Sequence, residues 1–301
     1  MAETAQSALA QAGPSIGPAP HGIWHDVWAR LRRNHLALAG GIVLLLLVAV
    51  ALFAPVIAPN DPIAQDYDHL LQGPSLHHPF GTDNFGRDIL SRVIYGARIS
   101  LTVGFLGTLI GVAFGIMIGV PAGYYGGWFD GLAMRLIDIQ LAFPGLLLAI
   151  ALIAVLGVGA QNVVVAIGIF SVPGFARILR GSILSLKQQD FVTAARALGA
   201  NDRRLMFAHL LPNALAPVLV IATLRLGTAI LTAASLSFLG LGIRPPSPEW
   251  GAMLSDGRQF LQLAPHVAIF PGLAILITVL ALNLLGDGLR DALDPKLRKS
   301  G

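Results

Sequence analysis

Long apolar runs that are almost free of charge alternate with shorter polar segments along most of this chain. Six of these runs are candidates for membrane-crossing helices, at residues 36–58, 99–122, 139–156, 160–176, 214–240 and 264–285. About 20 apolar residues in a helix are needed to cross the roughly 30 Å hydrocarbon core of a bilayer. The pattern therefore predicts an all-α integral membrane protein with six transmembrane helices.

The composition agrees with this pattern. Of the 301 residues, 55% are hydrophobic and only 12% are charged, whereas soluble domains carry about 25% charged residues. The chain has no cysteine, which excludes disulfides, thiolate metal ligands and thiol nucleophiles. The sequence pI is about 9.8, but the arginines flank apolar runs, so we attribute the basic balance to membrane topology and expect no nucleic-acid partner.

The first apolar run is too long for the core of a signal peptide, and no small-residue cleavage site follows closely. We therefore expect it to remain as a membrane anchor.

The distribution of lysine and arginine predicts the orientation, because cytoplasmic segments carry an excess of both. If the N-terminus is inside, the inner segments hold 14 of the 20: Arg30, Arg32, Arg33, Arg135, Arg177, Arg180, Lys187, Arg196, Arg203, Arg204, Arg290, Lys296, Arg298 and Lys299. We predict cytoplasmic tails at 1–35 and 287–301, an outer loop at 59–98 and a large inner loop at 177–213.

Small residues recur along one face of the second predicted span. The glycines are Gly104, Gly107, Gly111, Gly115 and Gly119. Such a stripe lets helices approach closely, and we favour packing within the bundle over a subunit interface or a sliding face. Pro144 and Pro173 are expected to start or kink the third and fourth spans.

The inner loop contains the stretch "TAARALGANDRRLMFAHLLPN", residues 193–213. Ala194, Ala195 and Leu198 form a small apolar face at helical spacing, and Gly199 is suited to end that helix in a left-handed turn. Asn201 or Asp202 would cap a second helix that Pro212 stops. The product is a helix, a turn and a helix, which either docks on a partner or lies on anionic lipid.

This stretch resembles the "EAA, three residues, Gly, nine residues, I-x-L-P" loop of permease subunits of binding-protein-dependent ABC importers. Ala194, Ala195, Gly199, Leu211 and Pro212 match, while Thr193 replaces the usual Glu and His209 the usual Ile. The resemblance implies a coupling loop that contacts a partner ATPase, with Arg196, Leu198 and Arg203 beside the motif. Thr193 removes a carboxylate that could pair with the ATPase.

Three other stretches, "FGTDNFGRDILSRVIYGARISL" (80–101), "SLSFLGLGIRPPSPEWGAML" (235–254) and "NLLGDGLRDALDPK" (283–296), narrow the resemblance. They are similar to the second permease subunit of dipeptide, oligopeptide, glutathione and nickel importers. The resemblance implies a type I ABC importer permease core of five helices, at 99–286, after one accessory helix. It also implies a bacterial inner-membrane location, a second homologous permease, two ATPase subunits or domains, and a periplasmic or lipid-anchored substrate-binding protein.

The chain carries no nucleotide-binding P-loop, which requires Gly-Lys followed by Ser or Thr. None of the three lysines, Lys187, Lys296 and Lys299, follows a glycine. We therefore expect no enzyme activity and no cofactor in this chain, with ATP and Mg bound by the partner subunits.

The outer segments hold the candidates for docking a binding protein: Asp83, Arg87, Asp88, Arg92, Glu249 and Trp250. Asp88 and Arg92 lie four residues apart, opposite an apolar face, which predicts a short interfacial helix before the second span. The prolines of "PPSPEWG" predict a rigid turn that exposes Glu249 and Trp250. Structural packing and aromatic anchoring are the alternatives. Adjacent His77 and His78 lack further ligands, so we predict no metal site.

Arg225 lies in the middle of the fifth predicted span. A charge at that depth must face protein or water. We expect it to meet the carboxylate of a substrate through two parallel hydrogen bonds, or to make a structural contact.

These features favour the permease subunit of a peptide importer, for dipeptides, oligopeptides or glutathione, with a nickel importer of the same family as the alternative. A proton-driven carrier would need carboxylates inside the spans and internal repeats, and no Asp or Glu falls within the six apolar runs. An intramembrane enzyme would need a catalytic constellation that the spans lack.

Overall fold

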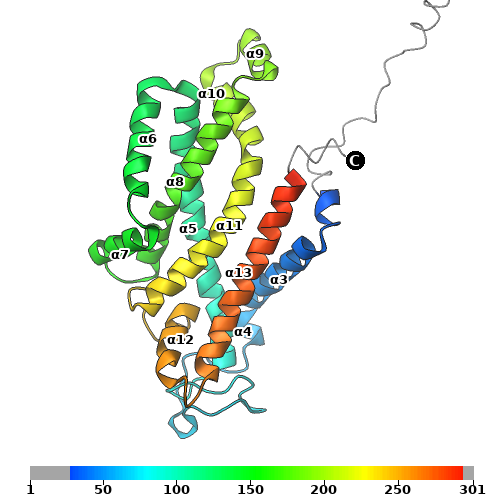
Figure 1. Cartoon of the computed structure of the whole chain (residues 1–301). Coiled ribbons are helices and arrows are strands. Elements are labelled where there is room, and N and C mark those ends of the chain that lie inside the picture. The colour runs from blue at the N-terminus through cyan, green and yellow to red at the C-terminus, as the bar shows by residue number, and fades with distance from the viewer. Residues whose placement is uncertain (1–27, 294–301) are drawn as a thin grey trace, which may run out of the picture.

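The computed structural model describes residues 28–293 as a bundle of long helices (Figure 1). Predictions about residues 1–27 and 294–301, including Lys296, Arg298 and Lys299, lie outside the described residues. The main helices are α3 (His35–Leu52), α4 (Ala54–Ile57), α5 (Ile89–Tyr125), α6 (Gly127–Leu141), α7 (Gly145–Leu156), α8 (Ala160–Leu186), α9 (Asp190–Ala197), α10 (Asp202–Arg204), α11 (Leu211–Phe238), α12 (Trp250–Gly257) and α13 (His266–Leu293).

Five helices of the described chain are long and apolar enough to cross a membrane, and a bent pair makes a sixth if it counts as one span. The bent pair is α6 and α7, which meet at 91°. Pro144 is the N-cap of α7, and proline disfavours a helical conformation in the residue before it. With the bent pair counted as one span, the six predicted spans are present, and the third is a broken helix that begins at Gly127 rather than near residue 139.

The second span is a single helix of 37 residues, α5. The separate interfacial helix predicted around Asp88 and Arg92 is therefore wrong. The Asp88 carboxylate caps α5 and accepts hydrogen bonds from the amide of Ser91 at 2.8 Å and from its hydroxyl at 2.7 Å. A helix that begins here is about 55 Å long, so it extends well beyond the bilayer core.

The fourth span, α8, continues to Leu186. Arg177 and Arg180, which the sequence placed in the inner loop, therefore lie on a helix. Arg180 Nε and Nη2 donate to the two carboxylate oxygens of Asp130 on α6, and Arg177 Nη2 donates to Asp138 on the same helix. Because each arginine is paired with a carboxylate, α6 and α8 can hold these charged side chains next to their apolar segments.

The glycine stripe of α5 packs inside the bundle, as predicted. A Cβ atom at Gly111 would lie 2.6 Å from the Cβ of Ser171 on α8, and one at Gly104 would lie 2.6 Å from Ile230 on α11. Any larger side chain would push these helices apart, so the stripe serves helix packing.

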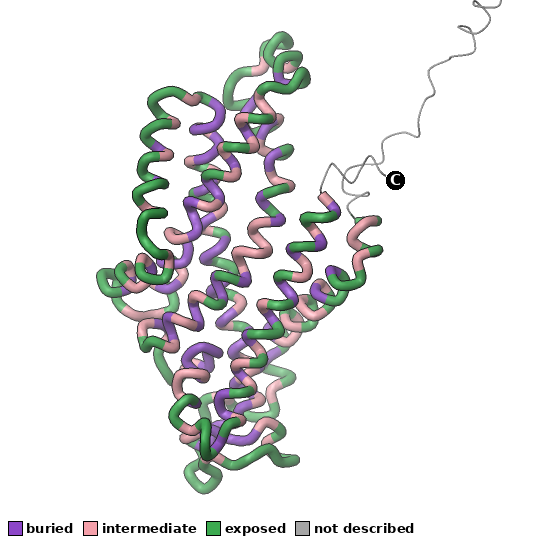
Figure 2. The backbone as a smooth tube through the Cα atoms, in the orientation of Figure 1, coloured by how far each residue is buried: buried purple, intermediate pink, exposed green. Residues whose placement is uncertain are grey.

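Burial follows the inward faces of the helices (Figure 2). The outward faces of several long helices remain apolar. Leu45 and Leu46 on α3 and Leu276 and Leu280 on α13 are all exposed. Apolar side chains on the outside of membrane-length helices are suited to contact with lipid.

Candidate functional site

The α9–α11 tip, defined here as residues 190–211, projects from one end of the bundle (Figure 1). Gly199 has φ of +85°, and the amide of Ala200 donates to the carbonyl of Ala195 at 3.1 Å. The left-handed turn predicted from the sequence is therefore present. Glycine is needed because a side chain strains this backbone conformation, although the space around Gly199 is open.

The first helix of the tip presents small and apolar side chains to its surroundings. Leu198 is 88% exposed, and the exposed residues beside it are Thr193, Ala194, Arg196 and Ala197. Ala195 is half-buried, and Arg203 is exposed on the following turn. Small side chains around a turn let another surface approach the backbone, so this face is suited to protein docking.

The second helix of the tip differs from the prediction. Pro212 was expected to stop it, but a wide π-helical turn, Leu205–Leu210, runs directly into α11. Proline has no amide hydrogen, so Pro212 cannot donate the backbone hydrogen bond of a regular helix. The π-helical turn ends at Leu210, two residues before this missing donor. His209 and Leu211 are half-buried along this continuous segment. The tip is therefore continuous with the long helix that carries Arg225.

The tip is attached to the end of α5 by polar contacts. The Tyr124 hydroxyl donates to Asp202 at 2.6 Å, and Arg196 Nη2 donates to the Tyr124 oxygen at 3.3 Å. Just before the tip, at the end of α8, Lys187 Nζ donates to the carbonyl of Gly123 at 2.9 Å and so caps the last turn of α5. Below these contacts, buried Val192 and Leu205 pack into the bundle core.

Arg225 lies half-buried on α11 with its guanidinium over Gly174 of α8. A Cβ at Gly174 would lie 2.8 Å from Arg225 Nη2. Within residues 28–293, the Arg225 guanidinium donates no hydrogen bond and forms no ion pair. Its five donors are therefore free for water or a ligand.

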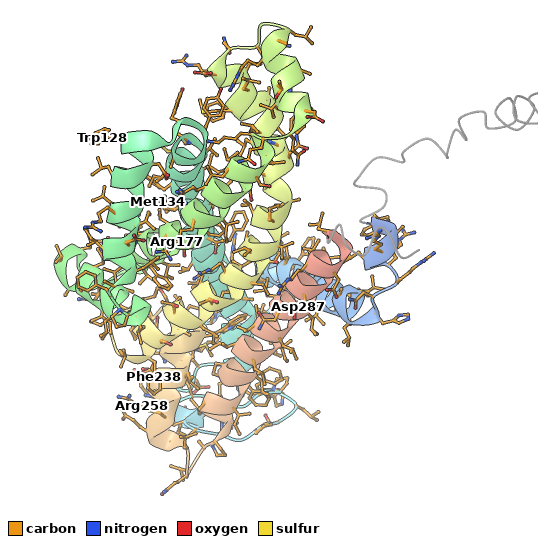
Figure 3. All side chains as sticks on the ribbon, turned by 45° about the horizontal axis from the view of Figure 1, so that its top comes forward. Trp128, Met134, Arg177, Phe238, Arg258 and Asp287 are labelled. Atoms are coloured by element: carbon orange, nitrogen blue, oxygen red, sulfur yellow. The ribbon has the colours of Figure 1, made fainter. Side chains whose placement is uncertain are left out.

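A polar stripe extends from Arg225 along α11, at the spacing that aligns side chains on one helix face. Its members are Arg225, Thr228, Thr232 and Ser235. The three hydroxyls donate to carbonyls of the preceding turn, for example Thr232 to Thr228 at 2.9 Å. At the end nearest α12, the guanidinium of Arg258 lies 4.9 Å from the ring centre of Phe238 (Figure 3). The sequence reasoning missed this stripe, which the three- and four-residue spacing of hydroxyls could have revealed.

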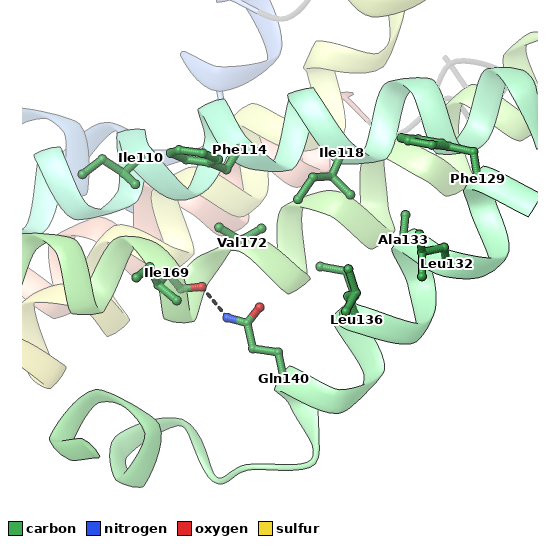
Figure 4. Close-up of a pocket in the computed structure, with 11 residues that line it drawn as sticks. Ile110, Phe114, Ile118, Phe129, Leu132, Ala133, Leu136, Gln140, Ile169 and Val172 are labelled. Carbon is green, nitrogen blue, oxygen red and sulfur yellow. Dashed lines mark hydrogen bonds between the residues drawn. The ribbon is translucent and has the colours of Figure 1, made fainter. Parts of the chain in front are cut away.

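A separate pocket of about 390 Å³ lies between α5, α6 and α8 (Figure 4). Its lining is almost wholly apolar, and its amide Gln140 donates to the carbonyl of Ile169 at 2.6 Å. A charged solute would lose its hydration there without gaining partners. The pocket is unsuited to a peptide substrate, in contrast to the polar stripe.

At the opposite end of the bundle, around α12, the charged side chains predicted to dock a binding protein are buried rather than exposed. Asp83 accepts from Arg87 Nε at 2.7 Å, and both side chains are almost fully buried. Arg92 Nη1 donates to the carbonyl of Pro62 at 2.8 Å, and Asp88 is paired with His78 at 3.0 Å. These contacts fix the loop before α5, residues 59–88, onto the start of that helix.

The predicted exposure of Glu249 and Trp250 is wrong. Glu249 caps α12 by accepting from the amides of Gly251 at 2.9 Å and Ala252 at 2.8 Å, and Trp250 Nε1 donates to the carbonyl of Val93 at 2.9 Å. Both are buried because helix capping and aromatic packing satisfy them internally. Docking of a binding protein at this end remains a prediction.

Asp256, at the end of α12, shares a small pocket with Arg87 and Arg92. Burial raises the pKa of Asp256 above its ordinary value, and the two arginines oppose that rise. Within the described chain, no group of three His, Asp or Glu side chains is placed to hold a metal ion.

Comparison with protein families gives two matches that together cover most of the chain. Residues 111–299 match the binding-protein-dependent transport system inner membrane component, and residues 22–74 match the N-terminal TM domain of oligopeptide transport permease C. The chain belongs to the family of binding-protein-dependent transport permeases. It is a multi-pass inner-membrane component, and the second match covers α3, the helix that precedes the core.

Individual relatives are close to this permease over most of its length. The glutathione transport system permease protein GsiD of Shigella flexneri serotype 5b (strain 8401) is 58% identical over 276 residues, 91% of each chain. The protein of the same name from Escherichia coli O1:K1 / APEC is 55% identical over the same shares.

A solved structure described as inward facing conformations of the MetNI methionine ABC transporter, in its SeMet soak crystal form, has the same fold as this permease. The TM-score is 0.55 at 20% identity, covering 68% of this chain and 97% of that chain. The predicted ABC importer permease fold is thus confirmed.

Proposed function

We propose that this permease forms half of the translocation pathway of an ATP-driven importer for small peptides, with glutathione as the favoured substrate. The relatives of 55–58% identity are named as glutathione transport permeases, which favours glutathione over the nickel alternative. The observation that carries the proposal is the continuity of the exposed tip with α11. Motion imposed at the tip is thereby transmitted to the helix that carries Arg225.

The tip supports an assignment of partners. Its exposed small residues are suited to contact a partner ATPase, which would bind ATP and Mg, since none of the three lysines follows a glycine as a P-loop requires. A second homologous permease would complete the pathway, and a periplasmic or lipid-anchored binding protein would deliver substrate. The start of α3 and the end of α13 lie at the same end as the tip (Figure 1), which supports cytoplasmic termini.

The polar stripe on α11 supports a pathway on this face of the permease. The exposed faces of α3 and α13 are apolar, so a face with hydroxyls and an unpaired guanidinium is suited to water rather than lipid. Glutathione has two carboxylates, and a guanidinium binds a carboxylate through two parallel hydrogen bonds. Arg225 is therefore proposed to bind the anionic part of the substrate.

A proton-driven carrier is not supported. The structure does place Asp130 and Asp138 in α6, within the broken span, contrary to the expectation of spans free of acidic residues. Both carboxylates are paired with arginines of α8, so they do not form a chain of titrating groups, and the family is one of binding-protein-dependent systems.

The proposal is tested by uptake into proteoliposomes that hold the complete complex with its binding protein. We expect glutathione uptake that requires ATP. Arg225→Met should lower uptake at least tenfold for free glutathione and less for glutathione whose carboxylates are amidated. Equal losses for both substrates would place Arg225 in the scaffold, and uptake in the absence of ATP would overturn the proposal.

A further inference from the structure

The proline inside α8 leaves one backbone carbonyl of that helix without its regular donor. Pro173 is buried in the middle of α8, and in a regular helix the amide of residue 173 would donate to the carbonyl of residue 169. Proline has no amide hydrogen, so this hydrogen bond cannot form. The carbonyl of Ile169 therefore needs a donor from outside its own helix, because a carbonyl left unpaired away from water is costly.

Gln140, in the last turn of α6, supplies this donor. Its Nε2 donates to the Ile169 carbonyl at 2.6 Å (Figure 4). The other side chains that line the pocket between α5, α6 and α8 are apolar, among them Leu136 and Val172. No other side chain of this pocket can therefore replace Gln140 as the donor. A residue of α6 thus restores to α8 the hydrogen bond that Pro173 removes.

The break between α6 and α7 lies against the same turn of α8. Gly145 is the first residue of α7, and a Cβ there would overlap the ring of Phe170. Phe170 directly follows Ile169, so the two helices on either side of the 91° bend both contact one turn of α8. The irregular point of the third span is therefore packed against the turn that precedes the proline of α8.

The residue after Pro173 makes the contact with Arg225. The Arg225 guanidinium, from α11, lies over Gly174, where a Cβ would be 2.8 Å from Nη2. One segment of α8 is therefore held by Gln140 from α6 and contacted by Arg225 from α11. A shift of the turn at 169–173 would move the backbone beneath the guanidinium. With an ordinary residue at 173 this turn would be held by its own hydrogen bonds, whereas here it depends on α6.

We propose that Gln140 is a positioning residue for substrate transport, which fixes the turn of α8 beneath Arg225 by supplying the hydrogen bond that Pro173 cannot. The inference rests on the proposed binding of an anionic substrate by Arg225. Because the donor comes from another helix, a movement of α6 relative to α8 breaks this hydrogen bond and displaces Gly174. The position of the guanidinium therefore depends on the broken third span as well as on α11.

The experiment is a double-variant cycle of Gln140 and Pro173 in the complete complex. Gln140→Met removes the donor and keeps a side chain of similar length in the apolar pocket. Pro173→Ala returns an amide that can donate to the Ile169 carbonyl, so Gln140 should not be needed in that background. Gln161→Met is the matched control, because Gln161 is exposed near the start of α8 and its side chain makes no hydrogen bond within residues 28–293.

Two quantities are measured. The melting temperature of the purified complex is determined for all four members of the cycle. The ratio between the uptake rates of free glutathione and of glutathione whose carboxylates are amidated is determined for the single variants, with the binding protein present. A role in positioning Arg225 changes this ratio, whereas a role in stability alone lowers both rates together.

We expect Gln140→Met to lower the melting temperature by several degrees, since it leaves a carbonyl unpaired in an apolar pocket, and to lower the uptake ratio at least threefold. In the Pro173→Ala background the same change should leave the melting temperature unaltered. Gln161→Met should alter neither quantity.

An equal fall in melting temperature in both backgrounds would show that Gln140 does not replace the donor of residue 173, and an unchanged uptake ratio would make its role purely structural; either result would overturn the inference. If Gln140→Met fails to assemble, Pro173→Ala must restore assembly, and a failure to restore it would have the same consequence. Absence of ATP-driven uptake by the wild-type complex would instead overturn the proposed function, while the melting temperatures still test the hydrogen bond.

Discussion

The hydroxyl of Tyr124, in the last turn of α5, donates a hydrogen bond of 2.6 Å to the carboxylate of Asp202 in the α9–α11 tip. The two residues are 78 positions apart in the chain. The contact joins the tip to α5 as well as to α11, so a force on the tip acts on two long helices at once.

Loss of this contact should weaken coupling. Tyr124→Phe removes the donor, and a hydrogen bond to a charged group contributes about 1.5–3 kcal/mol when buried, with less expected at this partly exposed site. We expect a several-fold rise in ATP hydrolysed per glutathione imported, with normal assembly. Tyr125→Phe is the control, since the neighbouring Tyr125 makes no hydrogen bond through its hydroxyl in residues 28–293. If Tyr124→Phe left the amount of ATP hydrolysed per glutathione imported unchanged, the contact would have no role in coupling.

Substitution of Gly199 should abolish ATP-driven uptake. Gly199→Leu introduces a side chain at φ of +85°, which is strained for any L-residue at about 1 kcal/mol or more, and it blocks the approach of a partner. Gly131→Leu is the control, because Gly131 on α6 is exposed, has open space around it and has no positive φ. Uptake and membrane insertion are measured together. Normal uptake by Gly199→Leu would show that the tip is not the coupling element.

Gly174 should be required for the position of Arg225. Gly174→Ala places a Cβ at 2.8 Å from Arg225 Nη2, closer than van der Waals contact permits, so the guanidinium must move. We expect glutathione uptake to fall several-fold while the amidated peptide is less affected. Gly227→Ala on α11 meets its nearest neighbour at 3.6 Å and should be nearly neutral. If Gly174→Ala and Gly227→Ala gave the same glutathione uptake, the position of the Arg225 guanidinium would not matter for transport.

Glu249 should matter for stability rather than for direct docking. Glu249→Ala removes the buried cap of α12, which costs about 1–2 kcal/mol for a helix cap. The melting temperature of the purified complex should fall, while the affinity of the remaining folded complex for its binding protein should be unchanged. A large loss of affinity with an unchanged melting temperature would favour the docking role predicted from the sequence.

The orientation can be tested with fusions at exposed positions. A reporter that functions only in the cytoplasm should be active when fused after Ser300 or within residues 187–190, and silent when fused at Asp66 in the outer loop. The physical reason is the excess of lysine and arginine in the inner segments. The opposite pattern would reverse the placement of the tip and the termini.

The number of spans, the left-handed turn at Gly199 and the family could all be predicted without coordinates. Hydropathy depends on residues close together in the chain, and the membrane requires about 20 apolar residues for each crossing. The turn depends on a local property of glycine. The motif around Ala194 and Pro212 is long enough to predict a coupling loop by resemblance, although it did not show that the helix continues past Pro212.

Other features depended on contacts between distant segments. Trp250 was predicted to be exposed because prolines surround it, yet its indole donates to Val93, 157 positions away. Arg177 was assigned to a loop because a charge ended the apolar run, whereas Asp138 on another helix allows it to remain on α8. Hydropathy describes each segment alone. Which faces meet, and hence which charges are paired and which remain free for a substrate, is decided only when the helices pack together.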